Sequence, residues 1–297
     1  MINLYINIKM KIDTLILSGG GPAGIGYHGI LKALFDKNIL NKDLDVIKEI
    51  ITLSIGILAS FVLLLKIDLD VSEKIATEIE FMNFLNLDDI SINNILDDYG
   101  IFDTDYINKL FKSLIKNYLK LDDLTLKELY DLSKIKLTVK VLNVTKKEYE
   151  YISYENYPEL SIITLAEMTT CIPIFFKPVK YNNCLYVDPG LKNAFPILKC
   201  KSKNYLGILL GGGCGDFSEN KLFNEYPILL FLYNIIISDD INDNFTKGIN
   251  FKENKRMIIS NLNIGINFDI DKEKKLKIIK ECYDNTINHL TKYKLLN

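Results

Sequence analysis

The sequence predicts a three-layer α/β fold in which helices flank a central, mostly parallel sheet. Two strand–helix units follow one another near the N-terminus, over residues 12–39 and 45–65. The chain is 48% hydrophobic over 297 residues, which is enough to bury a sizeable core. Since consecutive strand–helix units pair their strands in parallel, these observations favour one large α/β domain.

The first unit begins with a buried strand. Residues 12–18 (IDTLILS) are β-branched and apolar, and a glycine-rich loop, GGGPAG, follows directly at residues 19–24. Residues 25–39 then predict a helix, because apolar side chains recur there at helical spacing. These apolar side chains are Ile30, Leu31, Leu34 and Phe35.

The second unit contains an imperfect nucleophile motif. Residues 45–54 predict a strand and residues 56–65 a helix, with Thr52-Leu53-Ser54-Ile55-Gly56 at the junction. This is one residue short of G-x-S-x-G, the sharp strand-to-helix turn that exposes a nucleophilic serine. Thr52 replaces the first glycine, while Gly56 is present. Taken alone, Ser54 is more simply read as a structural serine than as a nucleophile.

The middle of the chain predicts helices followed by strands. Residues 71–135 mix polar and apolar side chains at helical spacing, and residues 134–155 alternate as two strands around a turn. A further helix ends at Pro173, and residues 177–197 read as a hairpin followed by the loop Asp188-Pro189-Gly190. The segment 204–216 (NYLGILLGGGCGD) predicts another buried strand that ends in glycines, among them residues 211–213.

The remaining residues, 214–297, are expected to form a helical part packed on the same domain. The apolar run at 227–237 predicts a core helix, and residues 271–295 predict an amphipathic helix rich in lysine. Low-complexity linkers and blocks of like charge, which would mark a second domain, are not found in the sequence.

Composition excludes several classes of function. The formal net charge of −2 argues against a nucleic-acid partner bound through phosphates. The five cysteines lack C-x-x-C spacing, which argues against a zinc site and suits a reducing compartment. The longest apolar run, residues 50–65, is too short to span a bilayer, and a signal peptide is not indicated. We therefore expect a soluble, intracellular protein.

The glycine loop permits three interpretations. Gly19, Gly21 and Gly24 fit G-x-G-x-x-G between a strand and a helix, so the amides there could hold a pyrophosphate or an oxyanion. The loop could equally be a plain tight turn. A dinucleotide site needs an acidic residue at the end of the next strand, but Asp43 and Asp45 stand at or before the start of that strand, which ends in Ser54 instead. A Walker A loop is excluded because G-K-[ST] is absent.

Only two histidines are present, His28 and His289, so a Ser-His-Asp triad would need one of them. His28 follows the glycine loop, where a packed histidine is the simpler reading. His289 lies on the predicted C-terminal helix. If Ser54 is a nucleophile, a base other than histidine is therefore to be considered.

Three features occur together in one order: the glycine loop after the first strand, Ser54 after the second, and Asp188-x-Gly190 on a late strand. With HGILKAL after the loop and the stretch 137–197, they resemble the patatin-like phospholipase family. The resemblance covers residues 12–213. It implies a patatin-like fold and an acyl hydrolase that uses a Ser-Asp dyad, which would explain why no triad histidine is needed.

The resemblance implies Ser54 as the nucleophile, Asp188 as its general base, and the amides of Gly19, Gly20 and Gly21 as an oxyanion hole. The implied reaction releases a fatty acid from a phospholipid or lysophospholipid. No metal or organic cofactor is implied, and contact with the membrane would be peripheral and transient.

The sequence departs from the family pattern around the predicted site, which bears on activity more than on fold. Two alternatives therefore stay open: a catalytically impaired lipid-binding protein of the same fold, and a dinucleotide-binding α/β protein. The departures are Thr52 for glycine, Ile55 for a small residue, Ala23 for a basic residue, Glu167 or Met168 near an expected arginine, and Pro189 for glycine.

Overall fold

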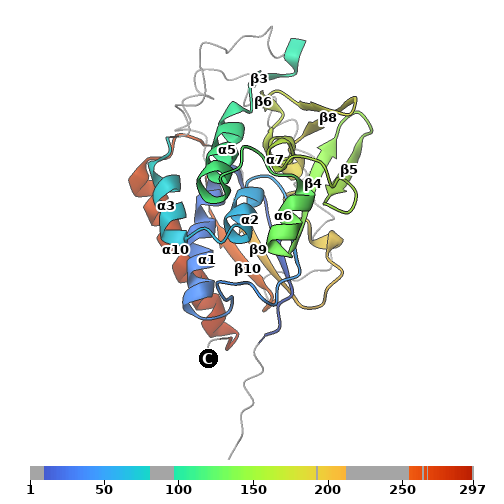
Figure 1. Ribbon diagram of the computed structural model, residues 1–297. Helices are drawn as coiled ribbons and strands as arrows, with labels where there is room; N and C mark the ends of the chain where they lie inside the picture. Colours follow the sequence, from blue (N-terminus) through green and yellow to red (C-terminus); the bar gives the residue numbers. More distant parts are fainter. Residues whose placement is uncertain are drawn as a thin grey trace, which may run out of the picture.

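The computed structural model describes residues 10–80, 97–191, 193–211, 254–262, 264–265 and 267–295. Its main sheet has the strand order β10-β9-β1-β2-β4-β8-β7, and β5 pairs with β4 (Figure 1). Strands β10, β9, β1, β2 and β4 are mutually parallel, whereas β5, β7 and β8 add antiparallel pairs. The predicted mostly parallel sheet flanked by helices is therefore confirmed.

The strands of the main sheet are β1 (Thr14–Leu17), β2 (Glu49–Thr52), β4 (Lys136–Asn143), β5 (Glu148–Ile152), β7 (Val179–Tyr181), β8 (Cys184–Val187), β9 (Tyr205–Gly211) and β10 (Met257–Asn261). A separate two-stranded sheet pairs β3 (Gly100–Phe102) with β6 (Ile174–Phe176). The α-helices are α1 (Gly26–Asp36), α2 (Gly56–Leu64), α3 (Leu69–Glu78), α5 (Asp105–Leu119), α6 (Leu126–Ser133), α7 (Ile162–Thr170) and α10 (Lys272–Lys292). Short 3₁₀ turns lie at η1 (Gly21–Ile25), η4 (Pro189–Leu191) and η5 (Ile197–Lys199).

Both faces of the sheet are packed. Strand residues alternate between the faces, so Leu15 and Leu17 of β1 point into the large cluster beneath the helices. Ile16 points the other way, into a smaller cluster with Phe195, Ile197 and Met257. Helices α2, α7 and α10 contact the strands, and α5 packs on α7. The buried run of α2 thus forms part of the core.

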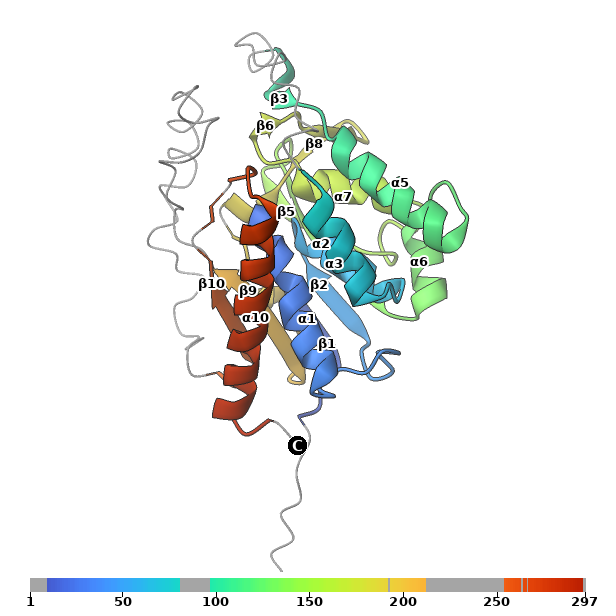
Figure 2. The same ribbon diagram turned by 90° about the vertical axis from the view of Figure 1, so that its left-hand side faces the viewer.

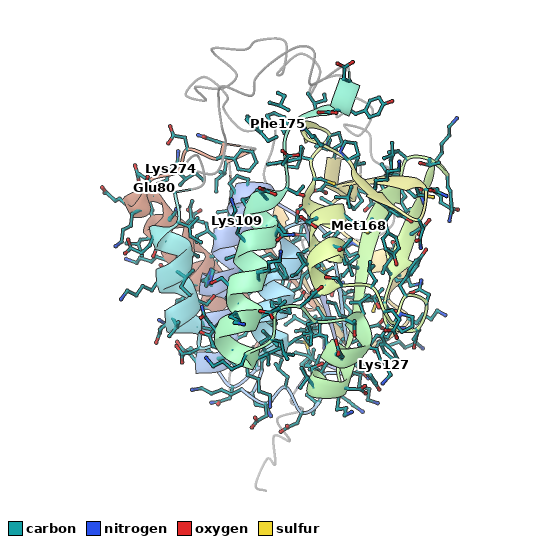
Figure 3. The ribbon with its side chains drawn as sticks, turned by 45° about the horizontal axis from the view of Figure 1, so that its top comes forward. Glu80, Lys109, Lys127, Met168, Phe175 and Lys274 are labelled. Carbon is teal, nitrogen blue, oxygen red and sulfur yellow. The ribbon has the colours of Figure 1, made fainter. Side chains whose placement is uncertain are left out.

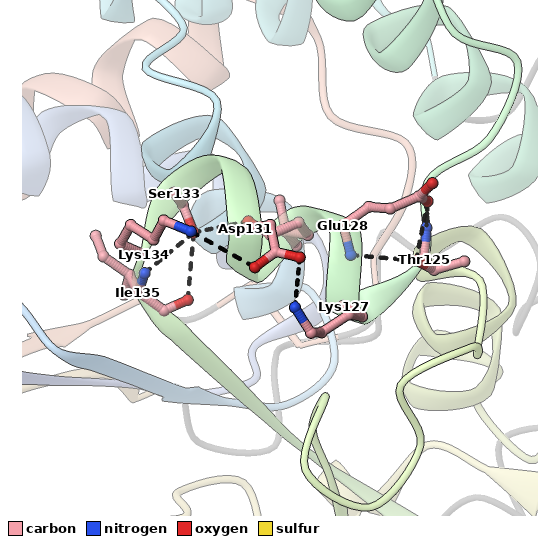
Figure 4. Close-up of polar contacts among 8 residues, drawn as sticks. Thr125, Lys127, Glu128, Asp131, Ser133, Lys134 and Ile135 are labelled. Carbon is pink, nitrogen blue, oxygen red and sulfur yellow. Dashed lines mark hydrogen bonds and ion pairs between the residues drawn. The ribbon is translucent and has the colours of Figure 1, made fainter.

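Helix α6 shows how local sequence sets an element boundary (Figure 4). The Thr125 hydroxyl accepts a hydrogen bond from the Glu128 amide (3.2 Å), and the Glu128 carboxylate accepts one from the Thr125 amide (2.8 Å). This capping box satisfies donors that a helix start leaves open. Lys127 and Asp131 form an ion pair one turn apart on the exposed side.

Helices α1 and α10 lie side by side although they are far apart in the sequence (Figures 1 and 2). Glycines on α1 allow this close approach. A Cβ atom at Gly29 would lie 1.9 Å from the Ile279 carbonyl oxygen, and one at Gly26 would lie 2.6 Å from Cys282 Sγ. Helix α10 also contacts η1, so it covers the turn that ends the glycine loop.

Several details differ from the sequence predictions. The C-terminal segment is not purely helical, because β10 extends the sheet beside β9, with Met257 and Ile258 buried. The region 71–135 includes the short strand β3, which gains its partner β6 only through tertiary pairing. The expected helix at 25–39 is shorter, since it begins after η1 and ends at Asp36. The predictions for 227–237 and for glycines 212–213 lie outside the described residues.

Within the part of the chain that the structure describes, every helix is too short or too polar to cross a bilayer.

The close packing of α1 on α10 predicts that Gly29→Ala destabilises the protein strongly. The new methyl group would collide with the Ile279 backbone, and overpacking of this kind costs about 1–3 kcal/mol or more. That cost exceeds the gain of about 1 kcal/mol in helix propensity from replacing glycine. Urea denaturation would measure the change. Gly26→Ala is the control and should cost less, since it meets a movable side chain; equal effects would contradict this account.

Candidate active site

Strand register brings Ser54 and Asp188 together. Strand β2 ends at Thr52, opposite Val139 of β4. Strand β8 runs the other way and ends at Val187, opposite Leu142 of β4. Because β5 occupies the other edge of β4 along this whole stretch, β2 and β8 must share one edge. The residues that follow these two strands therefore meet in the gap between their ends.

The two side chains form a direct hydrogen bond in this gap. Ser54 Oγ donates to Asp188 Oδ2 at 2.6 Å, which is within the range of a strong hydrogen bond to a charged acceptor. Both residues are buried, with exposed fractions of 5% and 4%. Ser54 adopts φ = 50°, a left-handed conformation that is strained for a serine. A buried, strained serine on a carboxylate is the arrangement expected of an activated nucleophile.

Thr169, near the end of α7, holds the strained turn in place. The Ser54 amide donates to Thr169 Oγ1 at 2.8 Å, and that hydroxyl donates to the Lys140 carbonyl, also at 2.8 Å. Since β2 has ended here, this carbonyl accepts the threonine hydroxyl at the edge that the strand vacates. Thr169 was not predicted from the sequence, where it is one of several hydroxyl residues in the helical segment 161–170.

Burial governs the charge of Asp188. Desolvation raises the pKa of Asp188 to about 6, against the lowering effects of the hydrogen bonds from Ser54 and the Gly190 amide and of the Lys140 charge. The Gly190 amide donates to Oδ1 at 2.7 Å, so each carboxylate oxygen has a donor. A carboxyl group with a pKa near 6 can accept a proton at neutral pH.

The glycine loop passes beside the nucleophile. A Cβ atom at Gly19 would lie 2.9 Å from Leu53 Cδ1 and 3.2 Å from Ser54 Cβ, so the close approach requires glycine. The Gly19 amide donates to the Ala194 carbonyl at 2.9 Å and is thus occupied in this arrangement. Of the three predicted oxyanion donors, the amides of Gly20 and Gly21 therefore remain the candidates. Gly21 has φ = 50°, which favours glycine.

The structure accommodates Thr52 and Ile55 at the elbow. Thr52 is fully buried in β2, and a Cβ atom at position 56 would lie 2.3 Å from its Oγ1, so Gly56 makes room for the threonine. A Cβ atom at position 24 would lie 2.3 Å from Ile55 Cγ1, so Gly24 makes room for the isoleucine. The Thr52 hydroxyl has no hydrogen-bond partner among the described residues.

The other departures are also packed. Ala23 is buried in η1, and Met168 is fully buried in α7. Burial raises the pKa of Glu167, against the hydrogen bonds that its carboxylate accepts from Asn108 and Thr104 of α5. Pro189 begins η4 and offers no amide, so the next residue, Gly190, supplies the donor to Asp188.

The histidines have other partners than the dyad. His28 Nε2 lies 2.7 Å from Ser72 Oγ, and His28 Nδ1 lies 3.2 Å from the Ile25 carbonyl oxygen. Burial lowers the pKa of His28, against the hydrogen bond to Ile25. His289 Nε2 lies 3.1 Å from the Lys255 carbonyl oxygen.

The geometry gives no support to a dinucleotide site. The glycine loop follows the carboxyl end of β1, whereas Asp43 and Asp45 precede the amino end of its parallel neighbour β2. Both aspartates are exposed, and they lie at the amino ends of the parallel strands, whereas the glycine loop lies at the carboxyl ends. The acidic residue that would bind a ribose is therefore misplaced.

A largely apolar cavity of about 380 Å³ opens beside Ser54. Helices α1, α2, α3 and α5 contribute to its walls; Figure 3 labels Lys109 on the α5 wall. Near the serine, Gly21, Gly24 and Ile55 line it. Apolar residues farther along the cavity include Leu31, Leu58, Val62, Leu110 and Leu114.

Comparisons with known proteins agree with this geometry. The family model described as patatin-like phospholipase matches residues 15–200. The chain belongs to the patatin-like phospholipase family. Among proteins similar to this patatin-like chain is the probable lipid hydrolase 463L of Invertebrate iridescent virus 6, 32% identical over 186 residues. That match covers 62% of this chain and 61% of the viral protein.

A second relative matches over nearly its whole length. The uncharacterized protein R571 of Acanthamoeba polyphaga mimivirus is 24% identical over 297 residues, which cover 95% of this patatin-like chain and 97% of R571.

Solved structures of low sequence identity share the fold. The match with VipD from Legionella pneumophila covers 95% of this chain and 67% of the VipD chain. Its TM-score is 0.60 and the sequence identity is 17%. The ExoU–SpcU complex from Pseudomonas aeruginosa matches 96% of this chain with a TM-score of 0.54 at 12% identity. The chain spans only 52% of the matched chain in that complex.

The unpartnered hydroxyl of Thr52 predicts that Thr52→Val stabilises the protein by about 1 kcal/mol, because valine has the same shape and leaves no buried polar atom unsatisfied. Chemical denaturation would measure the change. Thr138→Val on the neighbouring strand is the control, since the Thr138 hydroxyl donates to Glu49 at 2.7 Å. The control should lose stability; a loss in Thr52→Val as well would contradict the assignment.

The raised pKa of Asp188 makes its effect on stability depend on pH. Between the ordinary aspartate value near 4 and the folded value of about 6, the folded protein binds a proton that the unfolded chain releases. The stabilising contribution is thus present below pH 4 and lost as the pH rises through 6. Asp188→Asn is therefore expected to raise the free energy of unfolding by about 2 kcal/mol at pH 8 and little at pH 4.

Asp13→Asn is the control for this measurement. Burial would raise the pKa of Asp13, but hydrogen bonds from Ser202, Asn204 and Thr14 hold it below its ordinary value. Its substitution should therefore cost stability at pH 8, the opposite sign. Denaturation curves at the two pH values would decide, and a pH-independent effect of Asp188→Asn would contradict the raised pKa.

Proposed function

We propose that this protein is a lipid acyl hydrolase that releases fatty acids from phospholipid or lysophospholipid esters. The single observation that carries the proposal is the 2.6 Å hydrogen bond from Ser54 Oγ to Asp188 in a buried elbow beside the glycine loop. Membership of the patatin-like phospholipase family and similarity to a probable lipid hydrolase support it.

In the proposed reaction, Ser54 Oγ attacks the ester carbonyl while Asp188 accepts its proton. The negative charge that develops on the carbonyl oxygen would be stabilised by the amides of Gly20 and Gly21, a contribution of a few kcal/mol per donor. Asp188 then returns the proton to the departing alcohol. In the second half-reaction Asp188 takes a proton from a water molecule, whose oxygen attacks the acyl carbonyl. The bond to Ser54 Oγ then breaks, Asp188 returns the proton to Oγ, and the fatty acid is released.

The cavity supports an acyl chain as the bound group. Ser54 lines it, and leucine, isoleucine and valine are the most frequent residues on its walls. An apolar chain would replace water along these walls and gain about 0.8 kcal/mol per buried CH₂. The substrate resides in bilayers, so the proposed contact with the membrane is peripheral and transient.

A catalytically impaired lipid-binding protein is the second candidate. The observation that favours it is Ala23, which places a buried methyl group in η1 where the family pattern has a basic side chain. Such a protein would bind lipid vesicles without hydrolysing them.

Labelling with a fluorophosphonate probe tests the proposal. Wild-type protein should be labelled and Ser54→Ala should not. Asp188→Asn should react at least about 10²-fold more slowly than wild type, since the proton acceptor is lost. Release of fatty acid from phosphatidylcholine and lysophosphatidylcholine vesicles should follow the same order. Ser72→Ala is the matched control, because Ser72 lines the same cavity and bonds His28 instead.

Each outcome distinguishes the candidates. If Ser72→Ala abolished labelling and Ser54→Ala did not, the assignment of Ser54 as the nucleophile would be wrong. A folded wild type that binds vesicles but neither labels nor releases fatty acid would favour the lipid-binding protein.

A further inference from the structure

Lys140 is a buried charge in the middle of β4, where only 1% of the residue is exposed. An ammonium group held away from water is costly unless its charge and its hydrogens are matched. The neighbouring residues of β4, Val139 and Val141, are fully buried apolar side chains, so a lysine between them calls for a local reason.

The register places Lys140 beside the dyad. On the edge of β4 shared by β2 and β8, Val139 is the last partner of β2 and Leu142 the first described partner of β8. Lys140 lies between these two positions, at the gap in which Ser54 and Asp188 meet. Its carbonyl already takes part there, since it accepts the Thr169 hydroxyl that holds the elbow.

The Lys140 side chain contacts the loop that follows Asp188. Nζ donates to the Asn193 carbonyl at 3.2 Å. The Asn193 side-chain amide is oriented so that both its oxygen and its nitrogen have a partner. Its oxygen accepts a hydrogen bond from Nζ at 3.1 Å, and its nitrogen donates one to the Phe195 carbonyl at 3.0 Å. Nζ also lies 3.9 Å from the centre of the Tyr149 ring, a favourable cation–π distance.

This loop links the base to the glycine loop. The Asn193 backbone amide donates to the carbonyl of Pro189, the residue that follows Asp188, at 3.3 Å. The next residue, Ala194, accepts the Gly19 amide. Lys140 therefore contacts the segment that connects Asp188 with Gly19 at the start of the glycine loop.

The charge of Lys140 also acts on Asp188. The other groups that face the carboxylate are the Ser54 hydroxyl and the Gly190 amide, which donate to it, and Tyr106 and Cys171. Burial, with the Asp188 charge, raises the pKa of Tyr106 and of Cys171, so both stay neutral near pH 7. Lys140 supplies the positive charge that favours the ionised carboxylate.

We propose that Lys140 is a positioning residue for the general base: it holds Asn193, whose backbone amide bonds to the Pro189 carbonyl, and its charge favours the ionised form of the Asp188 carboxyl group. This role rests on the proposed Ser54–Asp188 hydrolase. It separates into a tether, which needs a hydrogen-bond donor, and a charge effect, which needs the ammonium.

Three substitutions separate these two effects. Lys140→Arg keeps donor and charge, Lys140→Gln keeps a donor without charge, and Lys140→Met keeps neither. Lys136→Met is the control on the same strand, because Lys136 pairs with Glu155 and Glu49 instead. Thermal denaturation of each variant shows whether it is folded. If Lys140→Met is not folded, the test relies on Lys140→Gln.

The first readout is the pH dependence of fluorophosphonate labelling. In wild type, the rate should fall about tenfold per pH unit below the Asp188 pKa of about 6. In Lys140→Gln and Lys140→Met this fall should begin at a higher pH, since loss of the positive charge makes the ionised carboxylate less favourable. Lys140→Arg and the control should keep the wild-type profile. A merely structural lysine would lower rates or stability without moving the profile, which would overturn the proposal.

The second readout does not need activity. Carboxyl carbons labelled with ¹³C report the titration of Asp188 by NMR, assigned by its loss in Asp188→Asn. In Lys140→Gln, Asp188 should titrate at a higher pH than in wild type. If wild type fails to label, the hydrolase fails while this shift still tests the lysine. An unshifted Asp188 titration in a folded Lys140→Gln overturns the role of Lys140 whatever the activity.

Discussion

Strand β4 has two successive neighbours on one edge, and the candidate active site occupies the break between them. A parallel neighbour arrives and stops at Thr52, and an antiparallel one returns and stops at Val187. The backbone groups of β4 that lack a strand partner at this break are available to side chains, as the Thr169 bond to the Lys140 carbonyl shows. Elements far apart in the sequence thereby converge on a few positions of one central strand.

The interactions at this break depend on one another. The strained φ angle of Ser54 persists because its amide is held by Thr169, and the carboxylate of Asp188 is held by donors on both oxygens. Close backbone approach at Gly19 and Gly24 lets the glycine loop lie against the elbow. Burial raises the energy of the ionised carboxylate, and the surrounding donors and the Lys140 charge offset part of that cost. Groups whose buried charge is only partly compensated by their surroundings are typical of functional sites.

Local patterns predicted much of this arrangement. The strand–loop–helix units and the mostly parallel sheet could be inferred from short local motifs, and the pairing of Ser54 with Asp188 from the resemblance to the patatin-like family. The roles of Thr169 and Lys140 could not, since their contacts join segments separated by 115 and 53 residues. Thr52 and Ile55 looked like defects in sequence, but Gly56 and Gly24 provide the space that each needs. The engagement of the Gly19 amide likewise depends on a distant carbonyl.

The contact between α1 and α10 has a consequence for the order in which the protein can mature. Translation is vectorial, so α1 and the glycine loop before it leave the ribosome long before α10, which covers both α1 and η1. Until then the glycine face of α1 has no helix against it, and the loop lacks part of its support. The glycine loop and the Ser54 elbow beside it therefore reach their final packing only after α10 has been synthesised.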